Sequence, residues 1–146
     1  MTENDTGAAR TIAGIGLLGI ALTHILEAPD AFADAGYIGG LFVASVVGSV
    51  VLSAVLTSTD DTRAWTAAGG LAALVLLGYI LSRTTGLPGF TDYVGVWDEP
   101  LGLASMVAEG LVVCVTAGVL ATGPYLKRSR ERSARGAEMR RPAAQS

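Results

Sequence analysis

The chain is built from four long apolar stretches that are separated by short polar segments. The stretches cover residues 11–26, 35–57, 64–82 and 101–126. A membrane-spanning helix needs about 20 mostly apolar residues, and the last three stretches reach this length easily. The first has 16 residues and needs its flanks to cross a bilayer. Since spanning helices satisfy their backbone hydrogen bonds within one segment, the pattern predicts an all-α fold, a polytopic membrane protein with four transmembrane helices.

The composition supports this interpretation. Hydrophobic residues make up 51% of the chain and charged residues 16%, whereas a soluble domain has roughly 25% charged residues. We therefore expect one four-helix transmembrane domain, residues 1–126, followed by a tail, residues 127–146. The tail contains seven cations and two anions, and its composition predicts disorder and contact with anionic lipid. No folded nucleic-acid-binding module accompanies these cations, so we expect no nucleic-acid partner.

The distribution of Lys and Arg predicts the orientation of the helices. Arg10, Arg63 and the basic tail fall on one side of the predicted membrane. The other side holds residues 27–36 and 83–100, which contain several carboxylates and the single cation Arg83. Because cytoplasmic loops carry the excess of positive charge, both termini are predicted to lie in the cytoplasm, with the helices in the plasma membrane.

A cleaved signal peptide is an alternative interpretation of the first apolar stretch. Residues 31–33, "AFA", match the A-x-A pattern of a cleavage site that follows an apolar segment. A signal peptide begins with a positively charged region, whereas here Glu3 and Asp5 precede the lone cation Arg10. The spanning interpretation is preferred, and the cleaved form remains the alternative.

Small residues recur at intervals of four in the second stretch, at Gly36, Gly40, Ala44 and Gly48. Such a stripe lies on one helix face and allows two helix backbones to approach closely in a membrane. We interpret the stripe as a helix-packing surface within the bundle. A homodimer face is the less favoured alternative, which the pattern does not separate cleanly from packing within the bundle.

Glu109 is a carboxylate in the middle of an apolar run, "SMVAEGLVVCV". It lies nine residues after Pro100, or ~14 Å along a helix at 1.5 Å per residue, which is close to the bilayer centre. A charge there costs ~2.5–3.5 kcal/mol on insertion scales. Ser105 and Thr116 share its helix face, so Glu109 is predicted to face the bundle. It is either a neutral structural contact to a neighbouring helix or a group that handles protons or ions.

Four other polar residues are predicted at the same depth or nearer the outer surface. Arg83 ends the third helix with Tyr79 one turn deeper, and His24 lies three residues before Glu27 near the end of the first helix. With Glu109 they form a candidate polar site that opens outward, in which Arg83 is able to pair with an acid. The alternative for Arg83 is an interfacial residue whose charged end reaches the headgroups.

Metal, haem and enzymatic chemistry find little support. The chain has one His, so a bis-His haem site is impossible within one chain, and His24 remains only a remote candidate ligand. No G-x-S-x-G motif and no phosphate-binding glycine loop occurs. We expect no enzymatic activity, no metal and no cofactor.

Two functions are the leading hypotheses, and a redox or cofactor-carrying subunit that uses His24 is a weaker third. The first is proton or small-solute sensing, binding or translocation at the polar site. The alternative is an accessory or assembly subunit of a larger membrane complex, which the small-residue stripe would contact. The expected partners are the lipid bilayer and either another membrane protein or further copies of this chain.

Several motifs resemble those of a group of small, uncharacterised prokaryotic integral membrane proteins. The group shares a His near the end of the first helix, an S-R-T-x-G-L-P motif after the third, and a Trp-x-Pro-Leu-Gly motif followed by Ser and Glu. This chain departs from the last motif, because two residues separate Trp97 from Pro100. The resemblance implies a four-helix membrane protein and no particular activity. The matching residues are His24, Ser82, Arg83, Thr84, Gly86, Leu87, Pro88, Trp97, Pro100, Leu101, Gly102, Ser105 and Glu109.

Overall fold

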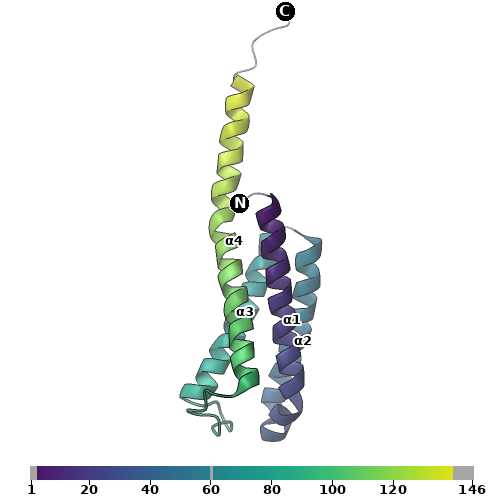
Figure 1. The fold of residues 1–146 in the computed structure, drawn as a ribbon, viewed down its shortest axis with the longest axis vertical. Helices are drawn as coiled ribbons and strands as arrows, with labels where there is room; N and C mark the ends of the chain where they lie inside the picture. Colours follow the sequence, from purple (N-terminus) through teal and green to yellow (C-terminus); the bar gives the residue numbers. More distant parts are fainter. Residues whose placement is uncertain (1–2, 60, 140–146) are drawn as a thin grey trace, which may run out of the picture.

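The computed structural model describes residues 3–59 and 61–139. Within these residues the chain forms four helices, which run alternately in opposite directions (Figure 1). The helices are α1 (Glu3–Asp34), α2 (Gly36–Ser58), α3 (Thr62–Thr84) and α4 (Pro100–Met139). Residues 85–99 form a loop between α3 and α4, and the end of the bundle where this loop lies is called the loop end below.

Each of the four described helices contains a segment that is long and apolar enough to cross a membrane. The prediction of an all-helical chain with four such helices is confirmed. The four segments are Thr6–Asp34, Gly36–Ser58, Thr62–Thr84 and Pro100–Thr122.

Two helices extend further than the apolar pattern predicted. Helix α1 continues through residues 27–34, including Pro29, where a polar loop was expected. The final turns of α1 pack on α2. The Phe32 ring of α1 lies against Gly39 of α2, in the space that a side chain at Gly39 would need. Helix α4 continues to Met139, beyond the predicted end of the span at residue 126, and residues 140–146 of the predicted tail lie outside the described part.

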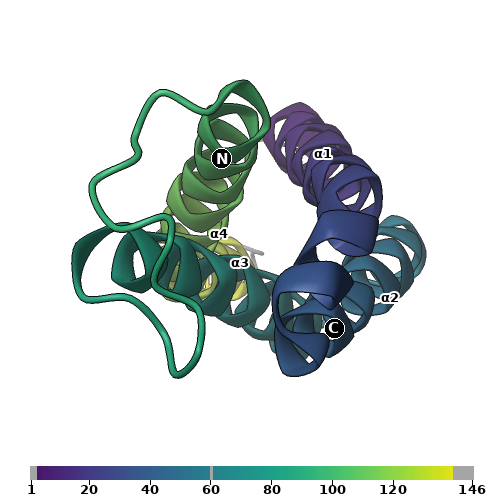
Figure 2. The same ribbon diagram turned by 90° about the horizontal axis from the view of Figure 1, so that it is seen from below.

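The helices are arranged in the order α2, α1, α4, α3 around the bundle. Helix α1 packs along both α2 and α4, and α3 packs along α4. Helices α2 and α3 have the least contact of the neighbouring pairs, and they separate toward the loop end (Figures 1 and 2). The bundle is therefore packed tightly on three sides and loosely on the fourth.

The tight sides depend on glycines at the helix crossings. A Cβ on Gly16 of α1 would lie 2.6 Å from Val112 of α4, and one on Gly69 of α3 would lie 2.5 Å from Thr116 of α4. Close backbone approach of this kind supplies the dispersion contacts that hold helices together in lipid. Leu17, Ile20 and Val112 are fully buried beside these crossings.

The packed face of α2 is a serine stripe and not the predicted small-residue stripe. Ser45, Ser49 and Ser53 are buried, and the Ser53 hydroxyl donates a hydrogen bond to the Gly14 carbonyl of α1 at 3.3 Å. A Cβ on Gly36 or Gly40 would meet nothing within 4 Å. This corrects the predicted packing role of these glycines within the bundle.

The other two positions of that stripe fare differently. Ala44 is exposed, whereas a Cβ on Gly48 would lie 3.1 Å from Leu71 of α3. Serine is as suitable as glycine for close packing, and it is also polar. A buried hydroxyl needs a hydrogen-bond partner, and Ser53 finds one across the contact between α2 and α1.

Candidate functional site

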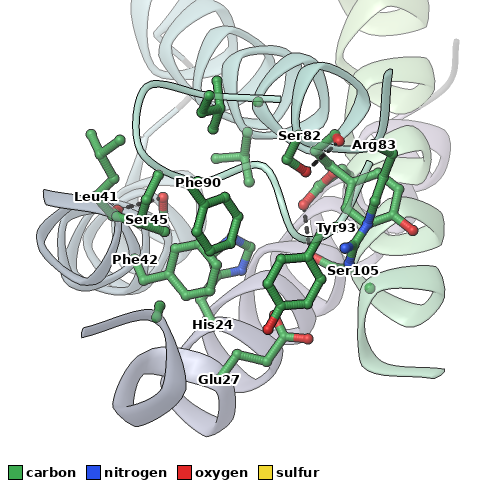
Figure 3. A pocket seen from close by; sticks show the side chains of 18 of the residues that line it. His24, Glu27, Leu41, Phe42, Ser45, Ser82, Arg83, Phe90, Tyr93 and Ser105 are labelled. Atoms are coloured by element: carbon green, nitrogen blue, oxygen red, sulfur yellow. Dashed lines mark hydrogen bonds between the residues drawn. The ribbon is translucent and has the colours of Figure 1, made fainter. Parts of the chain in front are cut away.

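A cavity of about 420 Å³ lies inside the loop end of the bundle. All four helices and the loop contribute to its wall, on the side where α2 and α3 separate. Its volume falls in the range of about 300–1,000 Å³ that is typical of small-ligand sites. The five residues predicted as a polar site all line it, and Figure 3 shows several of them projecting into it. They are His24, Glu27, Tyr79, Arg83 and Glu109.

Glu109 is fully buried on α4, with 0% of its surface exposed. Its Oε1 accepts a hydrogen bond from the Ser105 hydroxyl at 2.6 Å, and its Oε2 is buried without a partner. Ser105 lies one turn earlier on the same helix. Within the described residues, the carboxyl group therefore makes no hydrogen bond to a neighbouring helix, which is the contact that a purely structural role required.

Arg83 is buried at the end of α3, with 6% of its side chain exposed. Its Nη2 pairs with Glu99 Oε2 at 2.8 Å, and its guanidinium carbon lies 4.9 Å from the Tyr79 ring centre and 4.7 Å from that of Tyr93. Its Nε has no partner. Arg83 thus pairs with an acid as expected, but the acid is Glu99 of the loop and not Glu109.

Gly102 leaves the space that this arrangement requires. A Cβ at Gly102 would lie 2.7 Å from the Tyr79 ring, 2.8 Å from Glu99 Oε2 and 3.2 Å from Arg83 Nη2. Any larger residue would displace the ion pair from the surface of α4. Gly102 is therefore a positioning residue of the site.

Glu27 of α1 places a second carboxyl group beside Glu99. The two groups interact directly, and Glu27 also lies within the electrostatic reach of Arg83 and Glu109. The Oε1 of Glu27 is buried without a partner. Neighbouring carboxylates repel each other unless a proton or a cation lies between them. The residues that line the cavity thus include one guanidinium, that of Arg83, and five carboxyl groups.

His24 lies deeper, beneath the loop. Its Nδ1 is 2.9 Å from the Ile20 carbonyl, and because a carbonyl only accepts, Nδ1 carries the proton and Nε2 is an acceptor. The ring packs 4.7 Å from the Phe42 ring of α2. In the described part of the chain, no three His, Cys, Asp or Glu side chains lie close enough to hold a metal ion.

The loop, residues 85–99, covers the cavity and is hydrogen-bonded to α1 and α2. The Tyr37 hydroxyl donates to the Pro88 carbonyl at 2.6 Å, and the Tyr93 hydroxyl donates to Asp34 Oδ2 at 3.1 Å. The Phe90 and Tyr93 rings stack with centres 4.9 Å apart. Partial burial, followed by the hydrogen bond to Asp34, raises the pKa of Tyr93. The loop thus keeps its hydrogen bond to Asp34 throughout the neutral range.

Several residues of the site were not singled out from the sequence. Glu99 and Tyr93 of the loop were not among the predicted site residues. Phe42 was not singled out either, and Gly102 appeared only among the residues of the resemblance. The sequence clue to the first pair was the concentration of aromatic and acidic residues in 85–99, a segment too long for a simple turn.

No family model, curated protein or solved structure matches this chain. The function is therefore inferred from the site itself.

Proposed function

We propose that this chain is a multi-pass protein of the plasma membrane whose cavity binds a small solute. The solute carries a cationic group, which donates hydrogen bonds to the cavity. Binding of this kind serves sensing or translocation equally, and it involves no enzymatic step and no cofactor. Both termini lie in the cytoplasm in this proposal, and the loop end faces outward.

The charge pattern supports this orientation. Arg10, Arg63 and the cations after residue 126 belong to the end opposite the loop. The loop end carries Arg83, which is paired with Glu99. Under the positive-inside rule the loop end is the outer one.

One observation carries the proposed binding function: four buried polar atoms without hydrogen-bond partners line the same cavity. Buried polar groups are nearly always paired in folded proteins, and each unpaired one costs about 1–3 kcal/mol. A solute with a cationic donor would recover part of this free energy at the carboxyl oxygens and the Tyr79 hydroxyl, which can accept hydrogen bonds, whereas Arg83 Nε is itself a donor. The atoms are Glu27 Oε1, Tyr79 Oη, Arg83 Nε and Glu109 Oε2.

The balance of charge favours a cation. Arg83 is engaged with Glu99, which leaves Glu27 and Glu109 with no cationic side chain of their own among the residues that line the cavity. Asp30 and Asp34 line its wall at the end of α1 and add further negative potential. Carboxylates accept hydrogen bonds and attract ammonium groups.

Carbodiimide labelling of the purified full-length protein tests the proposal. Carbodiimides modify carboxyl groups in apolar, water-poor surroundings, and intact-mass spectrometry counts the adducts. We expect adducts at Glu109 and Glu27, and we expect Glu109→Gln to lose one of them. Asp92→Asn, at an exposed loop position, is the matched control and should leave the adduct count unchanged.

Protection by tertiary amines then measures binding. Tertiary amines are protonated near neutral pH, carry one N–H donor and cannot form an amide with an activated carboxyl group. We expect at least one member of the series from trimethylamine to N,N-dimethyldodecylamine to protect Glu109, and dodecanoate not to protect it. Labelling that no amine slows, or that dodecanoate slows equally, would contradict the proposed function.

An accessory role is the second candidate, and the outward face of α2 favours it. Gly36 and Gly40 meet no atom of the described chain that would restrict a side chain there, although their spacing suits close helix packing. A partner helix or a second copy of the chain is the natural occupant of such a face.

Leucine at both positions tests this candidate. Gly36→Leu/Gly40→Leu should raise the dissociation constant of a complex isolated in mild detergent by at least tenfold, because the added side chains hold the two helix backbones apart. Gly70→Leu on α3, which also has open space around it, is the control. A complex that tolerates the α2 double variant as well as the control would exclude this face as the contact.

A further inference from the structure

The cavity has a side opening between α2 and α3. Toward the middle of the bundle the two helices meet at Gly48 and Leu71, where a Cβ on the glycine would be 3.1 Å from the leucine side chain. At the loop end the opening is limited by the hydrogen bond between Tyr37 and the Pro88 carbonyl. Between these limits a Cβ on Gly78 would meet nothing within 4 Å.

The sides of the opening are apolar and exposed. Leu41 of α2 and Leu74 of α3 both line the cavity, and they are 56% and 68% exposed on the outer surface of the bundle. Both helices are apolar enough to lie in a membrane along this length. In the proposed membrane orientation the opening therefore faces lipid chains instead of water.

The interior of the cavity has an apolar side and a polar side. Figure 3 shows Leu41 and Phe42 on one side of the cavity and Arg83 and Ser105 on the opposite side. Glu109 belongs to the side of Ser105, from which it accepts a hydrogen bond, and Glu27 interacts with Glu99, the ion-pair partner of Arg83. A molecule that enters between α2 and α3 would pass apolar side chains first and meet the carboxyl groups last.

We infer that the ligand is an amphiphile with a protonated amine headgroup and an alkyl chain, and that it enters from the bilayer between α2 and α3. The inference rests on the proposed binding function and specifies its ligand class and route. The amine reaches the carboxyl groups of Glu27 and Glu109, and the chain passes between Leu41 and Leu74 into the surrounding lipid. A fully water-soluble cation would leave the apolar side of the cavity without contacts.

The length of the alkyl chain separates this route from simple cation binding. With the protein in nanodiscs, the concentration that half-protects Glu109 from carbodiimide is measured for trimethylamine and for N,N-dimethyldodecylamine. The concentration of the dodecyl compound is given as its mole fraction in the bilayer, so that its partitioning into lipid is not mistaken for affinity for the site. We expect half-protection by the dodecyl compound at a few mole per cent, and none by millimolar trimethylamine.

Narrowing the opening is the second arm of the experiment. Gly78→Leu places a side chain in the gap and should raise the half-protecting mole fraction of N,N-dimethyldodecylamine by at least tenfold. Ala44→Leu, from the α2 side of the cavity, should act in the same direction and serves if the first variant does not fold. Gly70→Leu lies two turns away on α3, outside the cavity wall, and should leave the value unchanged.

The outcomes distinguish the inference from the function on which it rests. Equal protection by trimethylamine, or an unchanged value in both narrowed variants, overturns the amphiphile and its lateral route while the cation site stands. Protection by neither amine overturns both proposals. Protection by the dodecyl compound alone, weakened by Gly78→Leu or Ala44→Leu, supports both.

Discussion

Arg83→Met is expected to lower the free energy of unfolding by about 2–3 kcal/mol. Removing one member of a buried ion pair costs about 3–5 kcal/mol, because the remaining charge stays buried and unpaired. The loss of stability should lie at or below the lower end of this range, since Glu99 is 28% exposed and regains some water. The variant also loses the packing of the guanidinium on the Tyr79 and Tyr93 rings.

Unfolding in mixed micelles of a non-ionic detergent and sodium dodecyl sulfate, followed by tryptophan fluorescence, measures this change. Arg63→Met is the matched control, because Arg63 is exposed at the opposite end of the bundle and such changes usually stay within ±0.5 kcal/mol. Arg83→Met/Glu99→Gln should regain part of the loss, since the second change removes the unpaired charge. Equal stability of Arg83→Met and Arg63→Met would show that the ion pair does not hold the loop.

The positions of the helices could be predicted because apolar length is a strong signal. Residues 35–57 and 64–82 became α2 (Gly36–Ser58) and α3 (Thr62–Thr84) with small changes at the ends. The same signal failed at the end of α1, because it measures solubility in lipid and not helicity. Residues 27–34 are polar and contain Pro29, yet contact between Phe32 and α2 keeps them helical.

The site was only partly predictable. Glu109 and Arg83 stand out because ionisable residues are costly in an apolar run, and their helix positions follow from the length of the run. Glu99 depends on the path of the loop, which turns at Gly86 and Gly95 with φ angles of 76° and 82°. Such turns are local choices of backbone conformation. No periodicity in the sequence places Glu99 beside both Arg83 and Glu27.

The hydrogen bonding of Glu109 separates a binding role from a structural one. A carboxyl group that links two helices stabilises a membrane bundle by about 0.6–2 kcal/mol. The hydrogen-bond partner of Glu109 is Ser105 of its own helix, and its second oxygen has none. A carboxyl group in this position contributes desolvation cost without linking helices. Such a group is retained in a fold when its unpaired oxygen serves a ligand or a proton.

Glu109→Leu is therefore expected to raise the free energy of unfolding by about 1–2 kcal/mol while abolishing amine protection at the site. Leucine is somewhat larger than the carboxylate side chain, has the open cavity beside it, and removes an unpaired buried polar atom. The freed Ser105 hydroxyl can donate to the carbonyl of the preceding turn, as serines in helices commonly do.

Unfolding in mixed micelles measures the change in stability of Glu109→Leu. Carbodiimide labelling of the remaining Glu27, with and without N,N-dimethyldodecylamine, measures the loss of amine protection. Val107→Leu, at a 67% exposed position on the same helix, controls for added apolar volume and should change stability by less than ~0.5 kcal/mol. A loss of stability in Glu109→Leu would mean that the carboxyl group holds the helices together, and the binding role would lose its main support.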